Sequence, residues 1–282
     1  MKMIKDQEFG GERPLYASHD LQLENVVIHE GESGLKECTN IVTRNCRFEG
    51  NYVLWRIDGL EMENCTIAEP SRASLWYSKN VVMKDCVVDG PKLLREVDDI
   101  TLERVKFTDG QETLWHCRGV KMSDCEMENG IYPFMHCENV EISNFNCKGK
   151  YIFQYAKNVV VRNAVIETKD AFWESDNCTV YDSTIKGEFL AWHSRNLKLV
   201  RCHIEGTQPL CYAEGLVLED CTMGDNADLA FEYSNVNATI KGHAVSIKNP
   251  HHGSIKVDSV GEIIIDENLI ADSDCKIEVA EE

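Results

Sequence analysis

Residues 80–125 read NVVMKDCVVDGPKLLREVDDITLERVKFTDGQETLWHCRGVKMSDC, and the same pattern recurs along this stretch. Each copy opens on an Asx or Gly residue, here called the anchor, and then alternates apolar and polar residues before a turn-forming residue. Short alternating runs bounded by Gly, Asn and Asp are typical of strands and turns rather than helices. Anchors lie 19 to 21 residues apart along most of the chain: Asp20, Asn40, Gly59, Asn80, Asp99, Gly119, Asn139, Asn158, Asn177, Asn196, Gly215 and Asn235.

This repeat predicts a parallel β-helix, a solenoid whose coils stack at a spacing of about 4.8 Å. The signature of leucine-rich repeats is absent, and a propeller needs about twice this period. We therefore expect one all-β domain, a single-stranded parallel β-helix of about twelve coils of 19–21 residues. An N-terminal cap is predicted over residues 1–14, the β-helix repeats over 15–242, and less regular strands with a cap over 243–282.

The thirteen cysteines fit the same repeat. Three of them lie two residues before an anchor, at Cys38, Cys117 and Cys137, and six lie six residues after one, at Cys46, Cys65, Cys86, Cys125, Cys202 and Cys221. Equivalent residues on adjacent coils lie within disulfide range. However, no C-x-x-C motif and no apolar secretory segment near the start is present. Since free Cys behaves as a small buried apolar residue, we predict reduced core thiols in a cytoplasmic protein.

The net charge of the chain limits the classes of macromolecule that it is expected to bind. The chain carries 48 acidic and 29 basic residues, for a net charge of −19. Nucleic acids and anionic membranes demand a basic surface, so we expect neither as a partner. No stretch approaches the roughly 20 apolar residues of a membrane span. A homo-oligomer is compatible with the sequence.

The residue before each anchor alternates in sign from coil to coil. Opposite charges on neighbouring coils attract, so the alternation predicts a ladder of ion pairs that disfavours slippage by one coil. The residues are Asp58, Lys79, Asp98, Arg118, Glu138, Lys157, Asp176, Arg195 and Glu214.

The segment from Phe172 to Pro250 resembles an uncharacterised bacterial family, a domain of unknown function grouped with the pectin-lyase-like β-helices. The stretches GTQPLCY (206–212) and FEYS (231–234) are specific to that family, and the resemblance covers nearly the whole chain. It implies a right-handed coil and brings no established activity. Active-site patterns of polysaccharide lyases and polygalacturonases are not present in convincing form.

Two columns of the repeat carry the chemistry. All five tryptophans lie four residues before an anchor, in what we call the tryptophan column: Tyr16, Lys36, Trp55, Trp76, Arg95, Trp115, Met135, Gln154, Trp173, Trp192, Cys211 and Phe231. The next position, here the polar column, reads Glu37, Arg56, Tyr77, Glu96, His116, His136, Tyr155, Glu174, His193, Tyr212 and Glu232. The flanking columns are apolar or small, although strict alternation forbids burying residues three apart. We therefore expect a bend that turns both columns outward.

Our leading hypothesis is an elongated site for a carbohydrate or glycoconjugate along these two columns. A carboxylate beside His raises the pKa of the imidazole and orients it for acid–base work, and indole faces suit sugar rings. The predicted acid–base residues are Glu174 and His193 as the best centre, Glu96, His116 and His136 as the second, with Tyr155 and Tyr212. The predicted substrate-binding residues are Trp55, Trp76, Trp115, Trp173, Trp192, Arg56, Arg95, Phe231 and Glu232.

The distances between the glutamates of the polar column limit the type of reaction. The glutamates of the polar column lie three or four coils apart, about 14–19 Å, which is too far for a two-carboxylate hydrolase. Lyase-like or isomerase-like chemistry fits better if there is catalysis. We predict no cofactor and no metal, since an in-register ladder is too flat to surround an ion. The alternatives are a structural aromatic ladder and a protein-interaction surface.

Overall fold

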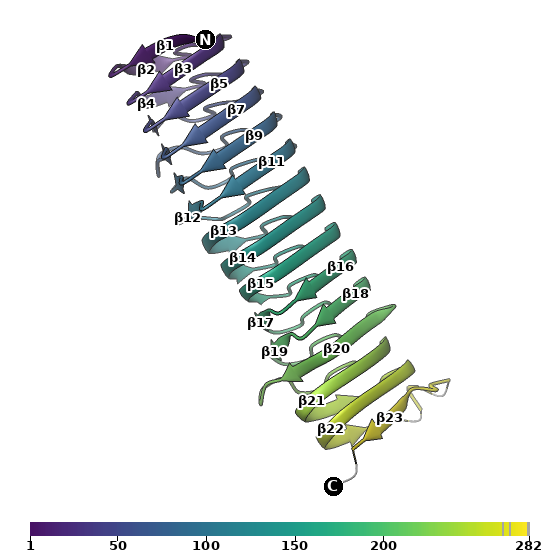
Figure 1. Ribbon diagram of the computed structural model, residues 1–282. Helices are drawn as coiled ribbons and strands as arrows, with labels where there is room; N and C mark the ends of the chain where they lie inside the picture. Colours follow the sequence, from purple (N-terminus) through teal and green to yellow (C-terminus); the bar gives the residue numbers. More distant parts are fainter. Residues whose placement is uncertain (267, 271, 281–282) are drawn as a thin grey trace. The chain divides into compact units, whose positions relative to one another are not determined.

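The computed structural model describes residues 1–266, 268–270 and 272–280 (Figure 1). The chain forms two compact units, residues 1–146 and 147–282. Every regular element in the described ranges is a β-strand, and no helix occurs in them.

Most coils of the first unit contribute one strand that begins one residue before the anchor and a second strand after a short turn. Neighbouring coils pair in parallel and in register, as between Leu60 and Val81. The strands are β1 (Lys2–Lys5), β2 (Glu8–Glu12), β3 (His19–Glu24), β4 (Val27–Glu32), β5 (Thr39–Arg44), β6 (Arg47–Phe48), β7 (Asp58–Glu63), β8 (Thr66–Ile67), β9 (Lys79–Lys84), β10 (Val87–Val88), β11 (Asp98–Glu103), β12 (Lys106–Phe107) and β13 (Arg118–Ile131). The boundary between the units falls within β14 (Glu138–Lys150).

The second unit repeats this parallel arrangement, as between Cys178 and Leu197. Its strands are β15 (Lys157–Lys169), β16 (Asp176–Tyr181), β17 (Thr184–Lys186), β18 (Arg195–Val200), β19 (His203–Glu205), β20 (Leu216–Met223), β21 (Asn235–Lys248), β22 (His252–Ile264) and β23 (Lys276–Val279).

The predicted all-β parallel solenoid is therefore confirmed, with about 15 turns rather than about twelve. Extra strands lie outside the range of the anchors. In the first unit β1 and β2 pair with β3 and β4, and in the second β22 and β23 continue from β21. Strand pairing needs only an extended backbone at coil spacing, so coils form where the anchor pattern has faded. The predicted cap boundaries stay a prediction.

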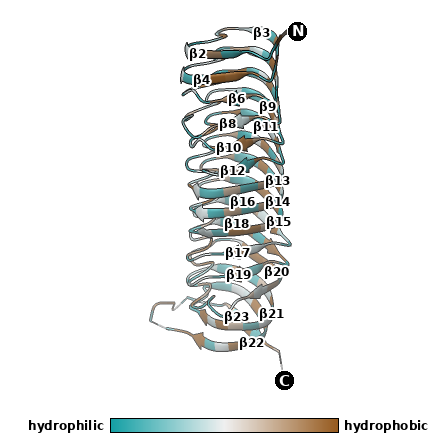
Figure 2. Cartoon of the chain, turned by 90° about the vertical axis from the view of Figure 1, so that its left-hand side faces the viewer, coloured by the Kyte–Doolittle hydropathy of each residue, from teal (hydrophilic) through white to brown (hydrophobic). Residues whose placement is uncertain are grey.

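The core of each unit is built by alternation along the strands. In β7, Leu60 and Met62 are each 1% exposed, whereas Glu61 and Glu63 face solvent. The alternation of hydrophilic and hydrophobic residues is visible along the strands in Figure 2. Because side chains of a strand point to opposite faces in turn, each coil adds one apolar layer to the core.

The sequence prediction of buried thiols holds, and part of the predicted charge ladder forms. No disulfide joins the thirteen cysteines, all of which lie in the described ranges, and twelve of them are buried. In the first unit the predicted ladder forms ion pairs, with 3.0 Å between Lys79 Nζ and Asp58 Oδ2 and 2.9 Å between Arg118 Nε and Asp98 Oδ1.

The predicted bend is present and is made by left-handed backbone. Leu54 and Arg56 have φ angles of 57° and 55°, and Trp55 lies between them. The two left-handed residues direct their N–H groups to opposite neighbours: Leu54 donates to Gly34 O and Arg56 to Trp76 O, each at 2.9 Å. Consequently Leu54 and Ile57 are both buried although they are three residues apart.

Candidate binding surface

The tryptophan column of the first unit is a stack of cations and indoles. Lys36 Nζ lies 4.3 Å from the ring centre of Trp55. The Arg95 guanidinium lies between two indoles, 4.2 Å from the ring centre of Trp76 and 4.4 Å from that of Trp115. Each contact is within the range of a cation–π interaction. The faces of these half-buried rings are therefore covered by residues of neighbouring coils.

The indole N–H groups are also engaged by the fold. Trp76 Nε1 donates to Lys92 O and Trp115 Nε1 donates to Tyr132 O, each at 2.6 Å. Trp55 Nε1 has no hydrogen-bond partner among the described residues. Two of the three rings are thus tied edge-on to backbone of the next coil, which holds them in place without a ligand.

The polar column of the first unit is exposed, as predicted. Tyr77, Glu96, His116 and His136 all face solvent, and so does Arg56. The imidazoles of His116 and His136 are stacked, with ring centres 4.8 Å apart and planes 10° apart. This separation is one coil spacing, so the rings stack because equivalent residues stack.

A shallow cleft of about 410 Å³ surrounds the stacked imidazoles. It is lined by Glu96, Asp98, His116, Arg118, His136 and Glu138. The guanidinium of Arg118 holds Asp98 through two hydrogen bonds of 2.9 and 3.1 Å. This pairing raises the pKa of Arg118, and the cleft therefore keeps a fixed positive group among its carboxylates.

Three lining residues, Asp98, Arg118 and Glu138, were predicted as ladder residues but not as part of a site. They belong to the ion-pair ladder, two positions after the polar column. On the coil of Arg118, the polar-column residue His116 has a left-handed φ of 54° and lies before strand β13. Strand alternation therefore does not predict that it shares a cleft with the ladder residue two positions later.

In the second unit, Glu174 and His193 lie on consecutive coils and both are exposed. Glu174 Oε1 accepts a hydrogen bond of 3.3 Å from Trp173 Nε1. His193 stacks on Tyr212, with ring centres 5.0 Å apart and planes 17° apart. No ion pair joins Glu174 to His193 in the described part of the chain. Each side chain thus contacts an aromatic neighbour instead of forming the predicted carboxylate–imidazole pair.

The residues of the tryptophan column in this unit differ from one another in burial. Trp173 and Trp192 are half-buried, with ring centres 5.7 Å apart, and Trp192 Nε1 donates to Gln208 O at 2.8 Å. Gln154 and Cys211 are buried. Tyr155 in the polar column is half-buried.

The last coil of the repeat corrects the predicted position of Phe231 and Glu232. Phe231 has a φ of 70° and no exposed surface, which are the features of the core column preceding the tryptophans. Glu232 O accepts a hydrogen bond from the N–H of Tyr212. In other coils the carbonyl that accepts from a polar-column N–H belongs to the tryptophan-column residue of the next coil. Tyr233 then occupies the polar column and stacks on Tyr212 at 5.6 Å. This coil has one residue fewer before its strand, so counting back from the anchor Asn235 misplaced both residues.

Glu232 is bound by a residue that the sequence did not single out. Lys248 Nζ lies 2.9 Å from Glu232 Oε1; the Glu232 side chain is buried and that of Lys248 is half-buried. The hydrogen bond to Glu232 raises the pKa of Lys248. Burial, and then the charge of Glu232, raise the pKa of Tyr212. Tyr212 is therefore a hydrogen-bond donor at neutral pH rather than a base.

No group of three or more His, Cys, Asp and Glu side chains in the described ranges is placed to hold a metal ion. In the same ranges there is also no helix with the length and apolar content needed to cross a membrane.

Comparison with solved structures gives β-helix proteins at low similarity. The A-module of mannuronan C-5 epimerase AlgE4 from Azotobacter vinelandii is 12% identical, with 99% of this chain and 87% of that chain covered and a TM-score of 0.32. The AlgE6 A-module from the same organism is 13% identical, with 94% and 91% covered and a TM-score of 0.35. HetL, a pentapeptide repeat protein from the cyanobacterium Nostoc sp. strain PCC 7120, is 9% identical, with 80% and 90% covered and a TM-score of 0.28. At these TM-scores the likenesses carry no argument about function.

Comparison by sequence identifies the family. The search among curated proteins gave no significant match. The model of the family described as "Protein of unknown function (DUF3737)" matches residues 2–278, nearly the whole chain. The chain therefore belongs to the DUF3737 family of proteins of unknown function.

Proposed function

We propose that this protein binds a saccharide or glycoconjugate in the cleft of the first unit around His116 and His136. The observation that carries the proposal is the composition of that cleft. Two imidazoles, three carboxylates and one guanidinium line a hollow of about 410 Å³, a volume within the usual range of small-molecule sites. Hydroxyl groups both donate and accept hydrogen bonds, so a sugar can use each of these side chains.

Recognition in this proposal rests on hydrogen bonds rather than on stacking against tryptophan. The Arg95 guanidinium covers the faces of Trp76 and Trp115 that point along the stack. A sugar ring therefore meets the polar column first and the indole edges second. The predicted role of the tryptophans changes accordingly, from a binding platform to a support beneath the cleft.

Proton transfer is compatible with the same residues. Imidazole is the side chain whose ordinary pKa lies closest to neutral pH, and it can accept or donate a proton there. His116 and His136 with Glu96 would suit a lyase-like or isomerase-like step on a sugar. Glu174, His193 and Tyr212 form the second candidate centre, with Tyr212 as a donor.

A second function has its own supporting observation. The cation–indole stack of the first unit is complete without a ligand, because its ring faces and two of its N–H groups are engaged by the protein. Such a stack stabilises a solenoid whatever the surface binds. We therefore keep a non-enzymatic scaffold that docks another protein as the alternative.

Screening of the full-length chain on a glycan array, followed by calorimetric titration with the best sugar, tests the proposal. The double variant His116→Ala/His136→Ala should weaken binding at least about tenfold, because the hydrogen bonds of both imidazoles to sugar hydroxyls are lost. His19→Ala is the control, since His19 is also exposed and lies on β3, outside the cleft. Absence of any sugar binding, or equal binding by both variants, would reject the cleft and leave the scaffold.

A further inference from the structure

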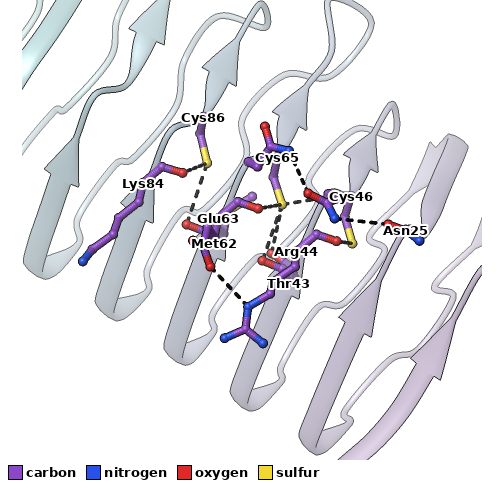
Figure 3. Close-up of polar contacts among 11 residues, drawn as sticks. Asn25, Thr43, Arg44, Cys46, Met62, Glu63, Cys65, Lys84 and Cys86 are labelled. Atoms are coloured by element: carbon purple, nitrogen blue, oxygen red, sulfur yellow. Dashed lines mark hydrogen bonds and ion pairs between the residues drawn. The ribbon is translucent and has the colours of Figure 1, made fainter.

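Three cysteine thiols follow one another on successive coils of the first unit (Figure 3). Cys46, Cys65 and Cys86 each lie between the two strands of their coil, and each is no more than 3% exposed. The residues directly after them pair in register, Arg47 with Thr66 and Thr66 with Val87. The three cysteines are therefore equivalent positions on neighbouring coils, and we call them the thiol ladder.

Hydrogen bonds single out the middle thiol. The N–H of Cys46 donates to Cys65 Sγ at 3.4 Å, and the Thr43 hydroxyl lies 3.4 Å from the same sulfur. The thiols of Cys46 and Cys86 contact backbone carbonyls instead, Cys46 Sγ at 3.2 Å from Arg44 O and Cys86 Sγ at 3.1 Å from Lys84 O. Because a backbone N–H and a hydroxyl face its sulfur, Cys65 is the member of the ladder placed to carry negative charge as a thiolate.

The spacing of the ladder suits a two-coordinate metal ion. Equivalent atoms on paired strands lie about 4.8 Å apart. Two thiolate–metal bonds of about 2.3 Å in a straight line span about 4.6 Å, whereas the two sulfurs of a disulfide must approach to about 2 Å. The thiols can therefore accept an ion between them with little movement.

We propose that the thiol ladder binds soft monovalent cations, with Cu⁺ as the preferred ion, each in linear coordination between two neighbouring thiolates. Thiolate is the side-chain ligand that selects Cu⁺. Linear coordination needs only two ligands, so it is consistent with the lack of groups of three or more metal-ligating side chains among the described residues. Three thiols in a row form two such positions, and the Cys65 thiolate bridges them.

The proposed binding of Cu⁺ to the thiol ladder balances in charge and in protons. Binding two Cu⁺ ions displaces the three thiol protons to solvent and leaves a cluster of three thiolates and two cations with a net charge of −1. Neither metal nor sulfur changes oxidation state. The N–H of Cys46 and the hydroxyl of Thr43 face the bridging sulfur and offset part of the cost of burying that charge.

The column itself contains a matched control. Cys125 occupies the same position two coils further on, and its sulfur accepts the N–H of Val105 at 3.4 Å, as Cys65 accepts that of Cys46. Its neighbours in the column are Val105 and Phe145 rather than cysteines. Cys125 therefore has the same hydrogen bond and burial but no partner thiol.

The test is anaerobic titration of the reduced full-length chain with Cu⁺ in competition with bathocuproine disulfonate, which gives the number of tightly bound ions. We expect Cys65→Ser to bind two ions fewer than the natural chain, Cys86→Ser to bind one fewer, and Cys125→Ser to bind the same number. X-ray absorption at the copper edge should show two sulfur ligands per ion.

An unchanged count for Cys65→Ser, or an equal loss for Cys125→Ser, would overturn the proposal, as would nitrogen or oxygen ligands in the absorption spectrum. Misfolding is separated from ligand loss by Cys65→Val, because Val105 already occupies this column. That variant should keep the thermal midpoint of the natural chain and still bind two ions fewer. If it binds the full number of ions, the ladder is not the site.

Discussion

Non-glycine residues in left-handed backbone recur in every bend of the tryptophan and polar columns. In the first unit Leu94, Glu96, Leu114 and His116 all have φ between 52° and 60°. A left-handed L-residue costs about 1 kcal/mol or more. The cost is offset because each such N–H finds a carbonyl on a neighbouring coil, as Glu96 does with Trp115 O at 2.9 Å. The exposure of the histidines is thus a direct consequence of backbone hydrogen bonding.

A second polar ladder, at the fifth residue after each anchor, escaped the sequence reasoning. Asn45 Nδ2 donates to Asn25 Oδ1 at 3.2 Å, and Asn64 Nδ2 donates to Asn45 Oδ1 at 2.7 Å. All three residues have φ near 53°. Asn tolerates this conformation better than other non-glycine residues. The corners of these three coils therefore carry a residue type that suits both the backbone and the side-chain ladder.

At the residue scale we predict that Arg95 stabilises the first unit through its two indole contacts. Arg95→Ala should lower the free energy of unfolding by about 2 kcal/mol, since two partly desolvated cation–π contacts and the ion pair of 3.2 Å with Glu112 are lost together. Urea unfolding followed by circular dichroism measures the change. Arg56→Ala is the control, because its side chain is 60% exposed, and it should change stability by less than about 0.5 kcal/mol. Equal effects of the two variants would contradict the stacked arrangement.

At the scale of the element, the close approach of backbone from the neighbouring coil limits which residue fits in a turn. Gly90 lies in the turn after β10, and a Cβ atom built on it would be 1.9 Å from Ser71 O on the previous coil. The Ser71 hydroxyl in turn donates to Gly50 O at 2.6 Å, one coil further back. These turns pack backbone on backbone, and they leave no room for a side chain.

Gly90→Ala should therefore destabilise the protein by about 3 kcal/mol, because a backbone carbonyl cannot move aside as a flexible side chain can. Thermal or urea unfolding measures the loss. Gly10→Ala is the matched control on β2, where the nearest atom to a built Cβ is His29 Cβ at 3.6 Å, and its effect should stay within about 0.5 kcal/mol. A neutral Gly90→Ala would mean that the coil spacing at this turn is wider than the structure has it.

Element boundaries also explain where the sequence reasoning about the site went wrong. Counting residues back from Asn235 placed Phe231 among the exposed aromatics, but the coil lacks one residue at its bend and Phe231 enters the core. A one-residue deletion leaves the strand pairing of Leu216 with Val236 intact. Spacing within the sequence therefore cannot reveal on which side of the bend the residue was lost.

At the scale of the whole molecule, the net charge of −19 dominates the response to salt. Self-repulsion of like charges destabilises a compact state, and salt screens it. The exposed ion pairs between coils, such as Lys79 with Asp58, act in the opposite direction but contribute at most about 1 kcal/mol each. We therefore expect the thermal midpoint to rise by several degrees between 0.05 and 0.5 M NaCl. A midpoint that falls over this range would show that the ion-pair ladders outweigh the net charge.

The sequence by itself determined the all-β solenoid, the buried thiols, the ion pairs between coils of the first unit and the outward position of the polar column in that unit. Each of these follows from a period of about twenty residues, because in-register stacking repeats one local environment on every coil. Only the tertiary structure decided which faces of the indoles are covered, that Asp98 and Arg118 join His116 in one cleft, and that Phe231 lies in the core. These depend on side-chain direction across coils and on a residue missing from one bend, and sequence spacing contains neither.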